Sequence, residues 1–225
     1  MPNLKRIFCC KNSSESVSNT SCSGYTNQRT SNTLSSEAKH IKTNVISKND
    51  EKSVDELRTA LSKKQKYVLT KNWKGISRDV TTAGANMFVA MLSQHSEYFP
   101  MFCFHEISSQ SPKNQLEDED LRAHGTIVME KLGEIISNIE DDHMFFKLLD
   151  EVGRDHADFA KNGFRPHMFW EMERPFLYAV KLVLGDRYTD SMDHIYKIVI
   201  KVILERLEKA CEDSLMHFDG AQALA

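Results

Sequence analysis

From residue 62 onward, apolar residues recur at intervals of three and four, the spacing of residues that share one face of an α-helix. No segment alternates between apolar and polar positions as a half-buried strand does. We therefore expect an all-α fold of six to eight helices, with connections too irregular for a simple four-helix bundle. The helical stripes run through Leu69, Trp73 and Ile76; Gly84, Met87, Phe88 and Met91; Leu121, His124, Val128, Leu132 and Ile135; Leu149, Val152 and His156; Phe169, Phe176, Leu177, Val180 and Leu184; and Met192, Ile195, Tyr196, Val199, Ile203 and Leu207.

Charged residues and prolines indicate where some of these helices begin. The acidic cluster Glu117–Asp120 stands where the positive end of a helix dipole favours negative charge, which predicts a helix start. Pro166 suits the first turn of another helix, which we expect to continue to Leu184. The polar stretch Ser108–Asn114 contains Pro112 and predicts a loop.

The N-terminal segment has a different composition. Between residues 11 and 50, Ser, Thr and Asn fill 21 of 40 positions, and no apolar period persists. Such a segment cannot bury enough apolar surface to offset the entropy lost on ordering. We expect a disordered polar extension over residues 1–55, a folded domain over 56–215 and a flexible C-terminal tail over 216–225.

Charge and hydropathy narrow the range of functions. Residues 1–61 carry nine of the 29 Lys and Arg and six of the 32 Asp and Glu, which leaves twenty basic and twenty-six acidic side chains for the remainder. This acidic balance argues against nucleic-acid binding. The longest apolar run near the N-terminus, Ile7–Cys10, is shorter than the ~7–15 residues of a secretory signal. No stretch approaches the ~20 apolar residues of a membrane span, so we expect a soluble cytoplasmic protein.

His156 is the first candidate for chemistry. It follows Leu149 and Val152 on one stripe, so its imidazole emerges from an apolar helix face. One nitrogen donor in an apolar wall suits a haem iron, because the macrocycle needs burial and the iron needs a neutral imidazole. The other ring nitrogen is then expected to donate to a backbone carbonyl about one turn earlier. Taken alone, a histidine at a helix end is ordinarily a capping or core residue.

His124 lies on a second stripe, four residues before Val128, and the adjacent Gly125 permits close approach of a flat group or a neighbouring helix. A histidine that faces a haem ligand can donate an N–H to bound dioxygen, which carries partial negative charge. Val128 would crowd the same ligand. A single helix histidine is ordinarily a partly exposed residue, but two such stripes together favour the functional interpretation.

Five motifs occur in a familiar order: Trp73, the run His95–Phe102, the run Leu121–Gly125 followed by Val128, the run Val152–His156, and the run Leu184–Thr189. Together they resemble the globin family over residues 62–213. The run that ends at His156 is most similar to neuroglobin-like and invertebrate globins, and the long polar extension is similar to that of nematode-type members.

The resemblance implies a globin fold that sandwiches haem b, iron protoporphyrin IX. It implies that His156 is the proximal iron ligand and that His124 is the distal histidine, with a second use as the sixth iron ligand. It further implies that Phe102 is wedged against the haem and that Val128 is the distal aliphatic residue. Val152 completes the set of haem contacts from the helix of His156.

Two positions depart from the family pattern. Ser96 stands where many globins have proline, although Pro100 nearby restrains the same corner. Ile127 replaces the basic residue that often reaches a haem propionate in globins. The propionate partners are therefore open; Arg122, Lys161 and His167 are the candidates.

Two functions are compatible with such a pocket. The first is reversible binding of dioxygen or another diatomic gas for storage, buffering or sensing, without enzymatic activity. The second is redox chemistry: electron transfer, signalling, or reactions with nitric oxide, nitrite or peroxide. In this second case it is open whether His124 also binds the iron when no gas is bound. No flavin- or nicotinamide-binding appendage is apparent, so the second function needs an external reductase. The oligomeric state is open.

A separate hypothesis concerns the N-terminus. Lys5, Arg6 and Lys11 flank the run Ile7–Cys10, in which Cys9 and Cys10 are adjacent thiols that can be S-acylated. Two acyl chains would hold the domain at a membrane surface. The alternative is an ordinary polar tail with incidental cysteines.

Overall fold

The computed structural model describes residues 60–222, with side chains up to residue 217, so the expected extension over 1–55 lies outside the described residues. Within the described part the secondary structure is helical and contains no strand, which confirms the expected all-α class. The α-helices are α2 (Lys63–Ile76), α3 (Val80–Gln94), α4 (Pro112–Gln115), α5 (Glu119–Ser137), α6 (Asp142–Ala157), α7 (Glu173–Leu184) and α8 (Asp190–Gln222). Shorter 3₁₀ helices are η2 (Ser96–Met101), η3 (His105–Ser109), η4 (Ala160–Asn162), η5 (Pro166–Met172) and η6 (Gly185–Arg187).

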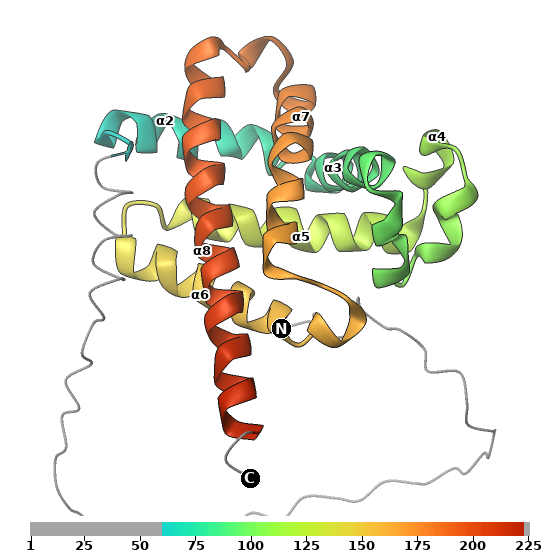
Figure 1. Cartoon of the computed structure of the whole chain (residues 1–225). Coiled ribbons are helices and arrows are strands. Elements are labelled where there is room, and N and C mark those ends of the chain that lie inside the picture. The colour runs from blue at the N-terminus through green and yellow to red at the C-terminus, as the bar shows by residue number, and fades with distance from the viewer. Residues whose placement is uncertain (1–59, 223–225) are drawn as a thin grey trace, which may run out of the picture.

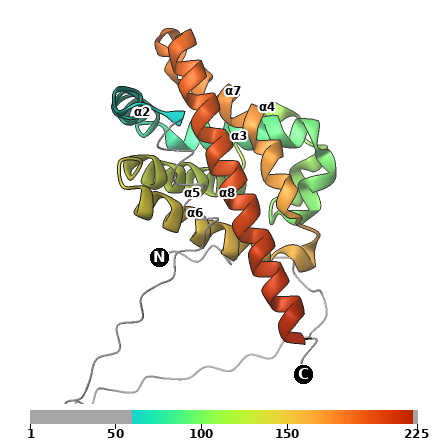
Figure 2. The same cartoon turned by 60° about the vertical axis from the view of Figure 1, so that its left-hand side comes forward.

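The helices form two crossing layers. Helices α7 and α8 lie side by side and run across α2, α5 and α6, as Figure 1 shows. The view in Figure 2, turned by 60°, shows α8 as one continuous helix over the layer of α2, α5 and α6. Contacts between α3 and α5 and between α6 and α8 are the most extensive in the fold. The core is built from buried apolar residues of α2, α3, α5, α6, α7 and α8.

Aspartate caps fix where two central helices begin. The side chain of Asp118 accepts a hydrogen bond from the Leu121 N–H at 2.9 Å and starts α5 within the predicted acidic cluster. Asp141 accepts from the Met144 N–H at 3.0 Å and starts α6. Each cap satisfies a backbone donor that has no partner within its own helix.

Two local predictions are wrong. The segment expected as one helix from Pro166 to Leu184 is divided into η5 and α7. Pro175 explains the division, because it has no N–H for the carbonyl of Glu171 and its ring is tolerated only in the first turn of an α-helix. The expected loop over 108–114 overlaps η3 and holds the start of α4, which begins after the Ser111 side chain accepts from the Asn114 N–H at 3.4 Å.

Glycines allow two pairs of helices to approach closely. A Cβ on Gly84 of α3 would overlap the carbonyl of Gly125 in α5, and a Cβ on Gly125 would lie 2.5 Å from the Gly84 carbonyl carbon. A Cβ on Gly153 of α6 would lie 2.6 Å from the Ala210 Cβ and 2.8 Å from the Leu207 oxygen in α8. The close approach expected beside His124 is therefore made by a neighbouring helix.

Helix α8 continues past residue 215, where we placed the end of the folded domain. It runs to Gln222, and its C-terminal part extends beyond α6 in both views (Figures 1 and 2). Met216 on this part has an exposed fraction of 64%. The boundary of the folded domain remains a prediction.

Candidate functional site

The five residues predicted for the site, Phe102, His124, Val128, Val152 and His156, all line one cavity. The empty space measures about 1200 Å³ when its opening to solvent is included. Its other lining side chains are Met87, Phe88, Met91, Tyr98, Met101, Ile127, Lys131, Leu132, Ile135, Phe164, Met168, Phe169, Met172, Phe176, Ile200, Ile203, Leu204 and Leu207. A mostly apolar wall with a few polar groups is typical of a cofactor or ligand pocket.

His156 lies in the last turn of α6, and a hydrogen bond fixes its ring. Its Nδ1 lies 2.7 Å from the carbonyl oxygen of Val152, one turn earlier in the helix. Because a carbonyl only accepts, Nδ1 carries the hydrogen, and Nε2 of the neutral ring keeps a lone pair for a ligand bond. The backbone carbonyl partner is the one expected from the sequence for a histidine that binds a metal.

Three phenylalanine rings surround the same imidazole. Phe159, Phe164 and Phe169 have ring centroids 5.8, 5.4 and 4.9 Å from that of His156. Burial among these rings lowers the pKa of His156, although the hydrogen bond to Val152 opposes the shift. The lowered pKa favours the neutral ring, which is the form that can bind a metal.

His124 lies on α5 and is nearly enclosed, with an exposed fraction of 5%. Phe88, Phe102 and Phe104 surround its ring at centroid distances of 4.5, 5.4 and 6.0 Å. Burial lowers the pKa of His124 to about 3, and His156 contributes in the same direction. His124 is therefore a neutral imidazole that faces the same apolar space as His156.

Some residues of the cavity were not predicted as site residues. Lys131 lines the cavity on α5, and its Nζ pairs with Glu134 at 2.5 Å. Lys131 lies seven residues after His124 on the same helix, and this helical spacing could have identified it as a lining residue. The three propionate candidates, Arg122, Lys161 and His167, are not among the described lining residues.

Methionines form a second unpredicted group. Met87 and Met91 reach the cavity from α3, Met101 from η2, and Met168 and Met172 from η5. A flexible thioether side chain fills irregular apolar space well. Only the tertiary structure brings these three segments together, so the sequence carried no local signal for the cluster.

The comparisons with known proteins agree with this architecture. A family model of the globins matches residues 85–207, and the chain belongs to the globin family. It is similar to neuroglobin from Tetraodon nigroviridis, with 22% identity over 149 residues that cover 66% of this chain and 91% of the relative. It is also similar to haemoglobin subunit zeta from Homo sapiens, with 26% identity over 156 residues that cover 57% of this chain and 99% of the relative.

A solved structure is similar over most of the described part. It is described as the crystal structure of a hexacoordinated haem protein from an anhydrobiotic tardigrade at pH 4. The TM-score is 0.62 with 25% sequence identity, and the alignment covers 68% of this chain and 96% of that chain. The predicted globin fold and the resemblance to neuroglobin-like globins are confirmed.

Proposed function

We propose that this globin holds haem b in the cavity between α5 and α6 and binds dioxygen reversibly, for storage, buffering or sensing. The observation that carries the proposal is that two neutral imidazoles, from His124 and His156, face one apolar cavity. Among residues 60–217, no group of three or more His, Cys, Asp or Glu side chains is placed so that these side chains by themselves could hold a metal ion. Two histidines in an apolar wall suit an iron whose remaining ligands come from a macrocycle.

His156 is the proposed proximal iron ligand. The bond from Nδ1 to Val152 sets the tautomer and the direction of Nε2, so the ring is oriented before any cofactor arrives. Phe164 and Phe169 pack against it and against each other at 5.1 Å. Val152 lies on the same helix and is the proposed contact with the face of the macrocycle.

His124 is the proposed donor to a bound gas. Haem iron, when present, supplies an open coordination position for a diatomic gas. A charge-assisted hydrogen bond from His124 Nε2–H is worth roughly 1.5–3 kcal/mol, which slows dioxygen dissociation by about tenfold or more. Phe102 and Val128 are the proposed contacts that keep the gas and the macrocycle in place and exclude water.

A second function has its own support. The tardigrade protein similar to this chain is described as hexacoordinated, and burial keeps His124 neutral and therefore able to bind a metal. In this alternative His124 is the sixth iron ligand at rest, and the protein acts in electron transfer, signalling, or the chemistry of nitric oxide, nitrite or peroxide with an external reductase.

The absorption spectrum of the purified ferrous protein without added gas separates the two functions. Full-length protein loaded with haem should show one broad visible band if the sixth position is open, and dioxygen should then bind and leave reversibly. Sharp, split visible bands would mean that both imidazoles bind the iron, which favours the redox function. No haem uptake by the folded chain would contradict both.

Location and domain limits are separate proposals. None of the described helices is both long enough and apolar enough to cross a membrane. We keep a cytoplasmic location, a folded domain over 56–215 and a tail over 216–225 as proposals.

Acylation of Cys9 and Cys10 concerns residues outside the described part. Cell fractionation of the wild type beside a Cys9→Ser/Cys10→Ser variant tests it, and identical distributions would contradict it.

A further inference from the structure

Lys131 is the one Lys, Arg, Asp or Glu among the described residues that line the cavity. The two lining histidines are neutral because burial lowers the pKa of each ring. The Lys131 side chain has an exposed fraction of 28%. A lysine of this kind can lay its methylene stem along apolar surface and keep its ammonium group hydrated. The cavity therefore offers a ligand one positive charge in an otherwise uncharged wall.

Two arginines lie on segments that line the cavity, but neither is a lining residue. Arg122 of α5 donates from Nη1 to the carbonyl of Leu116 at 3.1 Å. Arg165 donates from Nη1 to the carbonyls of Ala160 and Phe164 at 3.0 and 2.9 Å. The described bonds of both guanidinium groups thus go to backbone carbonyls and not into the cavity.

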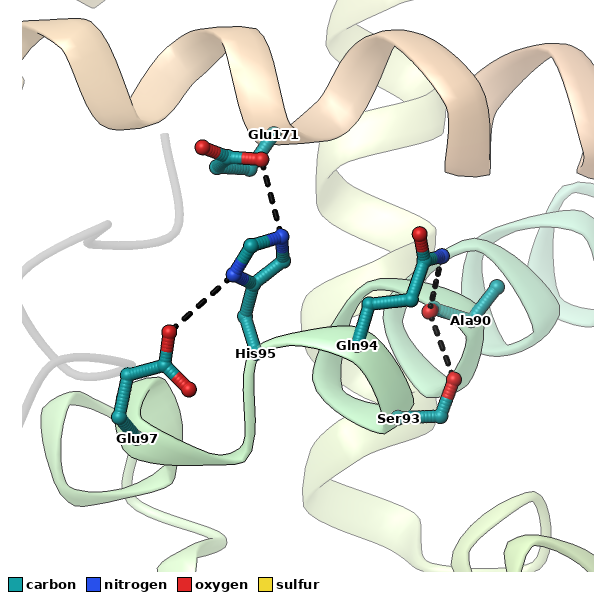
Figure 3. A network of polar contacts seen from close by, with 6 residues as sticks. All are labelled: Ala90, Ser93, Gln94, His95, Glu97 and Glu171. Carbon is teal, nitrogen blue, oxygen red and sulfur yellow. Dashed lines mark hydrogen bonds and ion pairs between the residues drawn. The ribbon is translucent and has the colours of Figure 1, made fainter.

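His95 is another basic residue near the cavity, because its ring stacks on the lining residue Tyr98 with centroids 5.2 Å apart. Its Nδ1 lies 3.1 Å from Oε1 of Glu97, and its Nε2 lies 2.9 Å from Oε2 of Glu171 (Figure 3). Each ring nitrogen faces a carboxylate of the protein, so no N–H is left for a carboxylate of a ligand. Lys131 is therefore the described cation that is placed to bind an acidic ligand in the cavity.

The ammonium group of Lys131 can bind more than one carboxylate. It has three N–H donors, and the described contact uses one of them, toward Oε2 of Glu134 at 2.5 Å. Glu134 follows one turn later on α5, and 46% of its side chain is exposed, so this pair is not sealed from solvent. A ligand carboxylate can therefore join Lys131 without breaking its contact with Glu134.

We propose that Lys131 binds a carboxylate of the cofactor, namely a propionate of haem b, in place of the candidates Arg122, Lys161 and His167. The macrocycle of iron protoporphyrin IX is apolar, and its two propionates carry its acidic groups. An apolar wall that contains one ammonium group complements this distribution of charge. This inference rests on the proposed haem function. Because Lys131 is partly exposed, we expect it to slow haem loss by only about two- to fivefold.

The rate at which the haem-loaded, full-length protein loses haem to an excess of apomyoglobin tests the proposal. Lys131→Met keeps an unbranched side chain but removes the charge, and it should lose haem about two- to fivefold faster than the wild type. Lys131→Arg keeps the charge and should restore slow loss. Lys161→Met is the matched control, because Lys161 is exposed and does not line the cavity, and it should lose haem at the wild-type rate.

Haem dimethyl ester separates the charge from a change in packing, because esterification removes both propionate charges. The wild type and Lys131→Met should lose this ester at the same rate. Wild-type haem loss in Lys131→Met, or the same acceleration with haem and with the ester, would overturn the proposal.

Iron-free protoporphyrin IX gives a second measurement that needs no bond from His156. Its affinity for the haem-free chain, followed by porphyrin fluorescence, should fall about two- to fivefold in Lys131→Met and stay unchanged in Lys161→Met. Equal affinity in both variants and the wild type would overturn the proposal. A chain that binds the porphyrin but does not ligate iron would count against the proposed function, and the porphyrin affinities would still decide on Lys131. A chain that binds neither would contradict both.

Discussion

His156 and His124 face the same cavity from α6 and α5, but different contacts hold their rings. A hydrogen bond of 2.7 Å to the Val152 carbonyl orients His156, with phenylalanine rings around it. His124 is more deeply buried and is packed among Phe88, Phe102 and Phe104. A directional bond sets the angle of a ring, whereas edge and face contacts between rings tolerate small rotations at modest cost.

This difference suits two different tasks. A ring fixed in one tautomer and one direction is suited to hold an iron in every state of the protein. A ring held by packing is suited to bind the iron, to donate a hydrogen bond to a gas, or to move between these two arrangements. The backbones of both helices are fixed by close glycine contacts, at Gly125 and Gly153, so the contrast lies in the side chains.

The largest predicted difference between the two histidines is the loss of haem when each imidazole is removed. His156→Ala should lower haem affinity by more than the about 10–100-fold that loss of an outer-shell partner costs, because it removes the proposed iron ligand itself. His124→Ala should keep most of its haem. The rate at which each variant loses haem to an excess of apomyoglobin measures haem retention. Similar rates of haem loss in the two variants would contradict the assignment.

The crossing of α3 and α5 should be intolerant of added volume. Gly125→Ala places a Cβ 2.5 Å from the Gly84 carbonyl carbon, so the free energy of unfolding should fall by about 1–3 kcal/mol, measured by urea denaturation. Gly75→Ala on α2 is the control, since the nearest atom to its Cβ would be Nη1 of Arg187, at 2.8 Å, which is the far end of a flexible side chain. Equal stability losses would mean that the backbone contact at Gly125 is not the constraint.

The dioxygen kinetics test the role of His124. His124→Leu should raise the dissociation rate by about tenfold or more, because it removes a charge-assisted hydrogen bond. His194→Leu, a change at an exposed position on α8, should leave the rate unchanged. Stopped-flow measurement of dioxygen release checks both, and an unaltered rate in His124→Leu would mean that the ring does not contact the gas.

The smallest predicted effects come from loosening the aromatic packing around each of the two histidines. Phe104→Leu loosens the packing around His124 and should change dioxygen release about two- to tenfold, the range of a single aromatic contact. Phe164→Leu loosens the packing around His156, but the bond to Val152 should hold that ring and keep release within about twofold. The opposite order of the two effects would contradict the view that aromatic packing positions His124.

Much of this site was predictable because helical periodicity places side chains on faces. His124 and Val128, and likewise Val152 and His156, share a stripe four residues apart, and both stripes line the cavity. Lys131 lies on the same face of α5 as His124, but it was not predicted because a charged side chain is not expected on an apolar stripe. The division between η5 and α7 depends on Pro175, nine residues after the expected helix start, and the His95–Glu171 contact depends on tertiary packing.

Chemical rescue of a His156→Gly variant tests the central claim most directly. Without its imidazole the variant should lose iron-linked haem binding, and free imidazole in the buffer should restore both haem retention and the wild-type absorption bands. A His156→Gly variant that keeps haem and the wild-type spectrum without imidazole would contradict the account.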